Sequence, residues 1–431
     1  MIDDGDVLDA IIAGRFVDPE HGTRFHCPIG RLVVAESLDG EEAALVAGLR
    51  LGRRIAVVAD EATWDILGGR VARAIGAATT VVLKKPPADA EQAEEIRRRT
   101  RDAEALVAVG SGTVSDLCKL AAHRDRRRYA CFPTAPTSVG YVTATACLQQ
   151  RGVRVSLPAR PPAGLFVDLA VLRQAPARLI RAGIGCCLAR SVSQVDSLLA
   201  HHLQGAPHAD TPFDLALGEE GDLIELAHQD GLDPAAAVPL LVRLLLLLGL
   251  GEAMAPSGTS GSAGPHLVSH YVDSLAMPRP GCLHGEQLGV ASLSLARLQG
   301  EILARQEPPV VEPTWIDEEM LHARFGPIAE DCIKALKRKA LDRQAADQLN
   351  SRLASDWPRL RAKLRGAAVP VAKLERLQRE LGLPSTAAEV GIPADFYREA
   401  VVNARALRDR YGILDLAGDA GLLELFAAGQ G

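Results

Sequence analysis

Three histidines fall within nineteen residues and have the spacing of a polar site. His266 and His270 are four residues apart, so in a helix both imidazoles project from the same face. His284 follows His266 by 18 positions, at the expected start of the next helix. Imidazoles gathered in this way bind divalent metals such as Zn, Fe or Ni, or they relay protons. The alternative is that buried histidines bond only the backbone or one another, and we favour the site.

A second stretch has the residue types that bind phosphate. The apolar run 105–109 is typical of a buried strand, Gly110-Ser111-Gly112 follows at once, and 113–122 has helical periodicity. This order points backbone N–H groups and the positive helix end at a phosphate, and glycine lets the backbone approach a ligand closely. Asp116 and Lys119 share a helix face, where they would meet a ligand or each other. The alternative is a tight turn with a surface ion pair.

The elements that must position the glycine stretch alternate between strand and helix. We expect strands over 54–60, 79–85, 105–109, 128–134 and 165–167, with helices over 40–51, 61–75, 88–103 and 113–122. This rhythm predicts right-handed crossovers and a parallel sheet that binds ligands at the carboxyl ends of its strands. Asp60, which ends the strand 54–60, would accept hydrogen bonds from a ribose or would cap the next helix. Residues 133–148, rich in small and hydroxyl side chains, are expected to form a loop over a bound ligand.

From residue 177 onward the pattern is helical, so we place a domain boundary near Ala175-Pro176. Helices are expected over 179–203, 223–228, 235–250, 265–275, 283–306, 316–325, 329–357, 373–381, 394–411 and 421–427. The predicted organisation is an α/β domain over 1–175 followed by an all-α domain over 176–431. A stretch rich in Gly and Ser, 257–264, precedes the helix that carries His266.

Composition excludes several classes of partner. The 431 residues have a net charge of −6, only 4% are aromatic, and there is no basic stripe, which argues against nucleic acid. The most apolar run, 239–251, is too short to span a bilayer and contains Arg243, so a buried helix is expected. The acidic N-terminus is not typical of a signal peptide. The eight cysteines lack a disulfide-scaffold spacing, which favours a reducing cytoplasm.

Several motifs occur in an order that resembles a known family. They are Asp60–Thr63, Gly110–Thr113 with Asp116 and Lys119, Pro133–Ser138 with Gly140-Tyr141, Pro161-Pro162 to Asp168, Ala182–Gly185, His266–His270, His284-Gly285, Gly391–Pro393 and Arg408–Tyr411. Together they resemble the glycerol-1-phosphate dehydrogenases, in the group that also holds glycerol dehydrogenase, iron-type alcohol dehydrogenases and dehydroquinate synthase. The resemblance covers nearly the whole chain.

The resemblance implies a Rossmann-like nicotinamide-binding domain, then a helical metal-binding domain, with the active site in the cleft between them. The residues that match cofactor-binding positions are Asp60, Gly110, Ser111, Gly112, Thr113, Asp116, Thr134 and Thr137. Those that match metal-ligand positions are Cys186, His266 and His284. Cys186 stands where the family has an aspartate, and Val139 stands where the substrate loop of the family has another. A thiolate with two histidines suits zinc, yet we favour an empty or weakly occupied metal site.

We therefore expect hydride transfer between NAD or NADP and a small, optionally phosphorylated, alcohol or carbonyl compound. The candidate catalytic residues are His270, His284, Lys119 and Cys186, with one of the two histidines relaying the proton. Valine cannot bond a glycerol hydroxyl, so the substrate should not be glycerol 1-phosphate. Two alternatives are a synthase or lyase that uses Cys186 as nucleophile or thiol acid/base, and a degenerate binding subunit. We expect a cytoplasmic homo-oligomer that acts on a small molecule, without nucleic acid or membrane.

Overall fold

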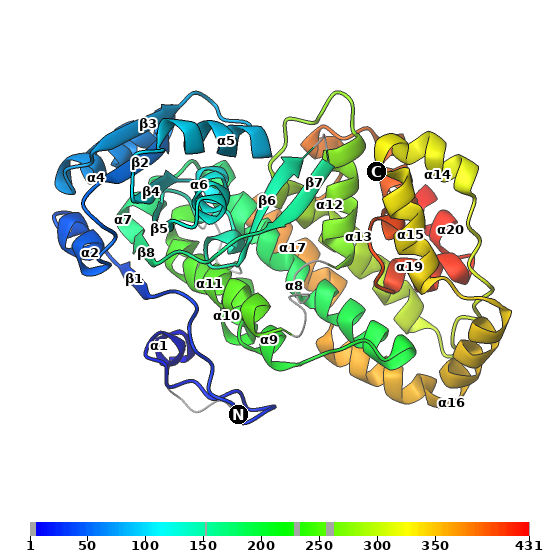
Figure 1. The fold of residues 1–431 in the computed structure, drawn as a ribbon. Coiled ribbons are helices and arrows are strands. Elements are labelled where there is room, and N and C mark those ends of the chain that lie inside the picture. Colours follow the sequence, from blue (N-terminus) through cyan, green and yellow to red (C-terminus); the bar gives the residue numbers. More distant parts are fainter. Residues whose placement is uncertain (1–5, 151–152, 228–232, 256–262, 431) are drawn as a thin grey trace. The chain divides into compact units, whose positions relative to one another are not determined.

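The computed structural model describes residues 6–150, 153–227, 233–255 and 263–430 (Figure 1). The chain divides into two compact units. The first comprises 1–184 and 210–254, and the second comprises 185–209 and 255–431. Most of the Gly/Ser-rich stretch predicted at 257–264 lies outside the described residues.

A six-stranded sheet forms the centre of the first unit, in the order β1-β8-β5-β4-β2-β3. All neighbouring strands in it are parallel. The strands are β1 (Arg31–Ala35), β2 (Ile55–Asp60), β3 (Thr79–Leu83), β4 (Ala105–Gly110), β5 (Arg128–Pro133) and β8 (Gly164–Asp168). The inner strand β4 is buried along its whole length, as expected for a strand covered on both faces. The predicted parallel α/β fold is confirmed, although β1 was not predicted.

The helical segments of the first unit are mostly short. They are α1 (Val7–Ile12), α2 (Glu42–Gly48), α3 (Glu61–Thr63), the π segment η1 (Trp64–Gly68), α4 (Gly69–Ala74), α5 (Ala90–Arg99), α6 (Gly112–Arg124), η2 (Val139–Tyr141), α7 (Leu169–Arg173), α9 (Thr211–Asp214), α10 (Leu217–Leu226), η3 (Pro234–Ala237) and α11 (Val238–Met254). The single helix predicted over 61–75 is thus split by a π segment. A Cβ on Gly68 in this segment would lie 3.0 Å from the Ala59 methyl group. Helix α6 packs on β4 and β5, directly after the glycine turn.

The region predicted as a loop, 133–148, is only partly a loop. It contains η2 and then β6 (Thr145–Gln150), which pairs antiparallel with β7 (Val153–Pro158). Sequence reasoning missed this pair of strands because they carry few β-branched residues. The hairpin extends the segment that follows Thr134 and Thr137 and packs against α6.

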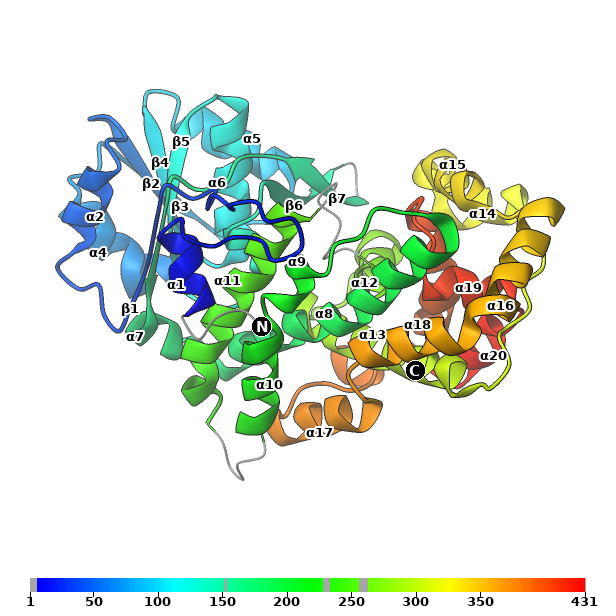
Figure 2. The ribbon, with the colours of Figure 1, turned by 90° about the horizontal axis from the view of Figure 1, so that it is seen from below.

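Helix α11 is the apolar helix predicted from 239–251, and it lies within the first unit. It packs against α9 and α10, and Figure 2 shows the three helices together. The segment 234–254 is long and apolar enough to cross a membrane by length and composition alone, but most of it is buried inside the protein. Leu241, Leu247 and Leu250 are fully enclosed, which is the placement expected for a core helix.

The second unit is helical throughout its described part. Its elements are α12 (Gly264–Leu275), α13 (His284–Ala304), α14 (Glu318–Phe325), η5 (Gly326–Ile328), α15 (Ala329–Lys339), α16 (Arg343–Ala367), α17 (Val371–Leu381), η6 (Ala388–Val390), α18 (Ala394–Asn403), η7 (Ala404–Leu407), α19 (Ile413–Asp419) and α20 (Leu423–Ala428). Helix α13 is its core: it contacts α12, α16, α17 and α19. The helix predicted over 329–357 is two helices, because Asp342 caps α16 through the N–H of Ala345.

Helix α8 (Ala177–Gln204) is divided between the units: its residues up to Ile184 belong to the first, and those from Gly185 belong to the second. This division into compact units therefore differs from the single domain boundary that we predict near 175–176. Residues 210–254 pack with the sheet-containing unit, since Gly249 of α11 lies against Val139 and Val142, and Gly251 lies against Pro212. Contacts between segments distant in sequence decide this arrangement, and local periodicity carries no information about them.

Candidate functional site

The predicted phosphate turn has the expected local geometry. Gly110 ends β4, Ser111 occupies the cap position, and α6 starts at Gly112. Among the described residues, no hydrogen bond is made to the backbone N–H groups of Gly112, Thr113 and Val114, and residues 111–113 are partly exposed. Three open N–H groups at the positive end of a 13-residue helix fit a phosphate group.

The glycines of this turn are also required by the protein's own packing. A Cβ on Gly110 would lie 2.7 Å from the Val114 side chain. A Cβ on Gly112 would lie 3.0 Å from the Ser138 side chain. The segment after β5 therefore rests directly on the first turn of α6, and any side chain at Gly112 displaces it.

Asp60 caps the helix after β2. Its Oδ1 accepts hydrogen bonds from the N–H of Thr63 at 2.8 Å and from the Thr63 hydroxyl at 2.9 Å. The geometry supports the capping alternative for this oxygen. Asp60 is only half-buried at the carboxyl edge of the sheet, so the predicted ribose contact by its other oxygen stays a prediction.

Asp116 and Lys119 pair with each other inside the first unit. The Lys119 ammonium is fully buried and donates to Asp116 Oδ1 at 3.0 Å, to Thr145 O at 2.9 Å and to Gly140 O. Asp116 Oδ2 accepts from the N–H of Cys147 at 3.0 Å. Because its three N–H bonds are all used internally, the placement favours a positioning role for Lys119 over the predicted catalytic role. The pair ties α6 to η2 and β6.

The segment after β5 places its small residues against α6 and its apolar ones toward α11. Thr134 is buried and its N–H donates to Gly110 O at 3.1 Å, while Thr137 approaches the Gly112 side of the turn. Val139 lines a small apolar cavity with Val242, Leu245 and Leu246 of α11, among other side chains.

The three predicted histidines lie together in the second unit. The ring centroids of His266 and His270 are 6.3 Å apart, those of His266 and His284 are 5.8 Å apart, and those of His270 and His284 are 6.2 Å apart. The first two come from α12, which presents them at i and i+4, and His284 is the first residue of α13. His270 is buried, while His266 and His284 are partly exposed, so the cluster is open to a ligand.

Glycines let α8 pass close to the start of α13. A Cβ on Gly185 would lie 2.1 Å from Gly285 O, a distance no side chain tolerates. Cys186 therefore directly follows the contact point on α8, and His284 directly precedes it on α13. A Cβ on Gly183, within the first unit, would lie 1.8 Å from Pro136 O.

The predicted metal ligands do not form a compact donor set. Among the described residues, the ligand atoms of Cys186, His266 and His284 do not lie within 4.8 Å of one another. Cys186 is a buried thiol in a helix, as in an ordinary core. The metal-ligand role of these three residues stays a prediction.

In the described part of the chain, one group of side chains does bring metal-ligating atoms together, and it has a structural role. Asp18, Glu20 and His21 bring their ligand atoms within 4.8 Å of one another. Asp18 Oδ1 accepts from the Thr211 hydroxyl at 2.6 Å, and Glu20 Oε2 accepts from the Asp210 N–H at 2.9 Å. These carboxylates cap the start of α9.

Sequence reasoning missed the polar residues that support His284. Its Nδ1 lies 3.0 Å from Ser269 Oγ, which donates to Gln287 Oε1 at 2.6 Å. Gln287 Nε2 donates in turn to Asp273 Oδ1 at 3.0 Å and to Cys282 Sγ at 3.3 Å. Ser269 lies inside the predicted histidine motif, which was the available signal.

Glu252 was missed as well, because it sits in an apolar helix. Burial raises its pKa to about 7, and the positive charge of Lys119 opposes this shift. The carboxyl group therefore titrates near neutrality at the end of α11.

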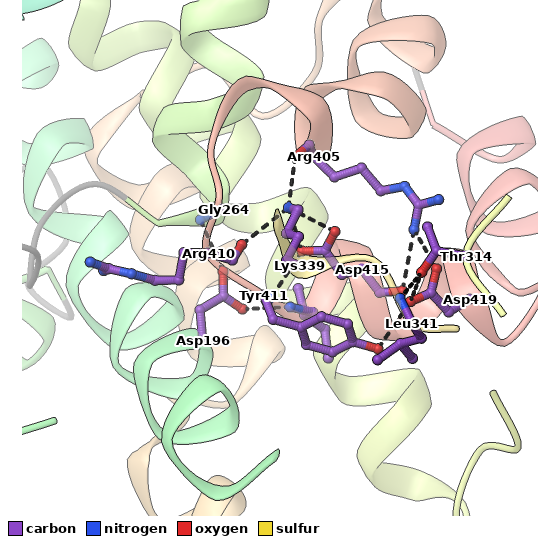
Figure 3. A network of polar contacts seen from close by, with 12 residues as sticks. Asp196, Gly264, Thr314, Lys339, Leu341, Arg405, Arg410, Tyr411, Asp415 and Asp419 are labelled. Carbon is purple, nitrogen blue, oxygen red and sulfur yellow. Dashed lines mark hydrogen bonds and ion pairs between the residues drawn. The ribbon is translucent and has the colours of Figure 1, made fainter. Parts of the chain in front are cut away.

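A buried polar network holds the start of α12 (Figure 3). Asp196 of α8 accepts from the N–H of Gly264 at 2.9 Å and from the N–H of Ile413 at 3.1 Å. Lys339 donates to Asp415 Oδ2 at 2.8 Å and to Arg405 O at 2.7 Å. The first residue of the histidine-bearing helix is thereby bonded to α8.

Comparisons with known proteins agree with this architecture. Residues 33–176 match the family described as iron-containing alcohol dehydrogenase. A glycerol-1-phosphate dehydrogenase [NAD(P)+] of Thermococcus sibiricus is 26% identical over 334 residues, which cover 74% of this chain and 94% of the relative. A protein of the same name from Sulfolobus acidocaldarius is 31% identical over 220 residues, 51% of this chain and 62% of the relative.

A solved structure supports the fold over nearly the whole length. The crystal structure of a probable glycerol dehydrogenase from Sinorhizobium meliloti 1021 has a TM-score of 0.59 at 18% sequence identity, covering 93% of this chain and 98% of that chain. The α/β sheet followed by helices is the same overall fold. This chain is therefore similar over residues 33–176 to the iron-containing alcohol dehydrogenase family, and over most of its length to glycerol-1-phosphate dehydrogenases.

Proposed function

We propose that this chain is an NAD(P)-dependent oxidoreductase that interconverts a small alcohol and its carbonyl compound. The observation that carries the proposal is the cluster of His266, His270 and His284, whose rings lie 5.8–6.3 Å apart. The relatives named glycerol-1-phosphate dehydrogenase [NAD(P)+] support the dehydrogenase chemistry and the cofactor.

The dinucleotide belongs on the first unit. The open N–H groups of Gly112, Thr113 and Val114 would hold its pyrophosphate. Residues 111–113, at that end of α6, are partly exposed. When bound, the nicotinamide supplies the acceptor or donor of the hydride. Thr134 and Thr137 are proposed at its nicotinamide end on the resemblance alone.

The histidine cluster handles the proton. Oxidation of an alcohol removes a hydride from carbon and a proton from oxygen, so a neutral imidazole must accept the proton. His284 and His270 are the proposed acceptors. We derive no step through a metal, because Cys186, His266 and His284 do not gather their ligand atoms.

We propose that neither glycerol 1-phosphate nor dihydroxyacetone phosphate is the substrate. Val139 faces the leucines of α11 and has no group that bonds a hydroxyl. A substrate whose hydroxyl needs a partner there would be rejected. Turnover of either compound at a rate ordinary for enzymes, on the order of 1–1000 per second, would contradict this.

The first test is a fluorescence titration of the purified protein with NADH and with NADPH, combined with elemental analysis. We expect saturable binding of at least one dinucleotide and much less than one equivalent of metal. Absence of binding of both up to millimolar concentration contradicts the proposed function. One equivalent of metal that is lost in Cys186→Ala would contradict the metal-free mechanism. The cytoplasmic location and the homo-oligomeric state stay proposals.

A further inference from the structure

We infer that Ser269, Gln287 and Asp273 form a hydrogen-bond chain that fixes the direction in which His284 can act. Within this hydrogen-bond chain, His284 carries its proton on Nδ1, which leaves the lone pair on Nε2. Its catalytic meaning depends on the proposed function, but the tautomer itself follows from the contacts of four side chains.

Asp273 sets the donor-to-acceptor direction of these hydrogen bonds. A carboxylate only accepts hydrogen bonds, so the side-chain atom of Gln287 that lies 3.0 Å from Asp273 Oδ1 must be the amide nitrogen. The second N–H of the same amide points to Cys282 Sγ at 3.3 Å. The orientation of the Gln287 amide is therefore determined, and its oxygen faces Ser269.

Ser269 passes this direction on to the imidazole. Its hydroxyl has a single proton, and Gln287 Oε1 at 2.6 Å can only accept. Ser269 Oγ must then act as acceptor toward His284 Nδ1 at 3.0 Å. A ring nitrogen that donates must carry hydrogen, so His284 is the Nδ1–H tautomer.

Burial makes this direction persistent. Ser269 is 1% exposed and Gln287 is 4% exposed, so water does not compete for their hydrogen bonds. Both residues are held by helices: Ser269 lies in α12 beside His270, and Gln287 lies one turn after His284 in α13. The chain thus joins the two helices that carry the histidine cluster.

The tautomer suits His284 to alcohol oxidation. The lone pair on Nε2 would accept the O–H proton of the alcohol, and a bound nicotinamide would supply the hydride acceptor, which leaves the carbonyl compound. Ser269 and Gln287 are therefore positioning residues, and they need not touch the substrate.

The experiment is nuclear magnetic resonance of the full chain labelled with 15N-histidine, at an alkaline pH where the imidazoles are neutral. His284 is assigned by the signals lost in His284→Gln. We expect its Nδ1 at the shift of a protonated nitrogen and its Nε2 at the shift of an unprotonated one, with the Nδ1–H form in excess by about tenfold. A predominant Nε2–H form in the unaltered protein would overturn the inference.

Three variants test the chain itself. Ser269→Ala removes the acceptor, so the Nδ1–H excess should be lost. Ser269→Thr keeps the hydroxyl and should preserve it. Asp273→Asn lets the Gln287 amide turn, so a mixture of tautomers is expected.

The matched control is Ser292→Ala, a buried serine of α13 whose hydroxyl has no hydrogen-bond partner among the described side chains. It should leave the tautomer unchanged. Circular dichroism of each variant establishes that the fold is retained. An unchanged tautomer in folded Ser269→Ala contradicts the inference. Because no substrate or dinucleotide is used, a failed NADH titration and a failed tautomer measurement remain separate results.

Discussion

We expect the proposed dinucleotide site to be sensitive to a side chain at Gly112. A Cβ there would lie 3.0 Å from Ser138, and its N–H is one of the three open groups at the start of α6. Gly112→Val should therefore push the segment after β5 away and cover the phosphate position. We expect at least a hundredfold loss of NADH or NADPH affinity in a fluorescence titration, which is about 3 kcal/mol of binding free energy.

The control for this prediction is Gly218→Val. Gly218 also lies in a helix of the first unit, and a Cβ on it would meet nothing within 4 Å. This variant should bind the dinucleotide like the unaltered protein. Equal affinity of both variants would show that the turn does not hold the phosphate.

Residue types and spacings located much of the candidate site. The i, i+4 spacing of His266 and His270 required only that α12 be a helix, which is a local property. Ser269 and Gln287 could not be recognised, because their role depends on the packing of α12 against α13. The metal-ligand role of Cys186 stays a prediction, because side-chain directions in different helices are not encoded by motif order.

At the scale of elements, the Asp116–Lys119 pair fastens α6 to the segments that follow β5. Lys119→Met should lower the free energy of unfolding by about 3–5 kcal/mol, since it leaves the buried Asp116 carboxylate without its cation. Urea denaturation followed by circular dichroism measures this loss.

The double variant Lys119→Met with Asp116→Asn distinguishes charge from packing. It leaves no uncompensated charge, so it should be more stable than Lys119→Met alone. A double variant no more stable than the single one would mean that the loss comes from packing.

The close crossing of α8 and α13 leads to a second prediction, on the stability of glycine variants. Gly185→Ala places a methyl group 2.1 Å from Gly285 O and should destabilise the protein by at least about 1–3 kcal/mol. Gly289→Ala at the same crossing meets its nearest atom at 3.5 Å, an ordinary contact. It should be neutral or slightly stabilising, because alanine favours helix by about 1 kcal/mol over glycine. Thermal unfolding of the two variants compares them directly, and equal melting temperatures would refute the close approach.

Local patterns predicted the elements of the sheet better than those beyond it. The apolar runs of β2, β4 and β5 are long enough to identify buried parallel strands. The hairpin of β6 and β7 lacks such a run, and its place is determined by contacts with α6. The break between α15 and α16 depends on a single capping aspartate within a continuous amphipathic pattern.

At the scale of the whole molecule, Asp196 makes stability depend on pH. Burial raises its pKa from 3.8 to about 6, and the hydrogen bonds from Gly264 and Ile413 only partly oppose this. The folded protein therefore binds more protons than the unfolded chain between about pH 4 and pH 6. The contribution of this group to the free energy of unfolding is full below pH 4 and falls by about 3 kcal/mol as the pH rises through 6.

Asp196→Asn should remove this component. We expect the difference in unfolding free energy between the unaltered protein and Asp196→Asn to change by about 3 kcal/mol between pH 4 and pH 7, measured by urea denaturation. Asp222→Asn, at an exposed position of α10, controls for the loss of a surface carboxylate. A constant difference across this pH range would contradict the assignment to Asp196.

The hydrogen bonds of Asp196 also set an order of events during synthesis. Gly264 follows it by 68 positions and Ile413 by 217. At roughly 5–20 residues per second, a ribosome makes the second partner about 10 to 40 s after the carboxylate. The helix that carries His266 and His270 can thus be anchored early, whereas the second unit closes only when α19 emerges. During that interval the Asp196 carboxylate lacks the N–H of Ile413, so its hydrogen bonding is incomplete until α19 is made.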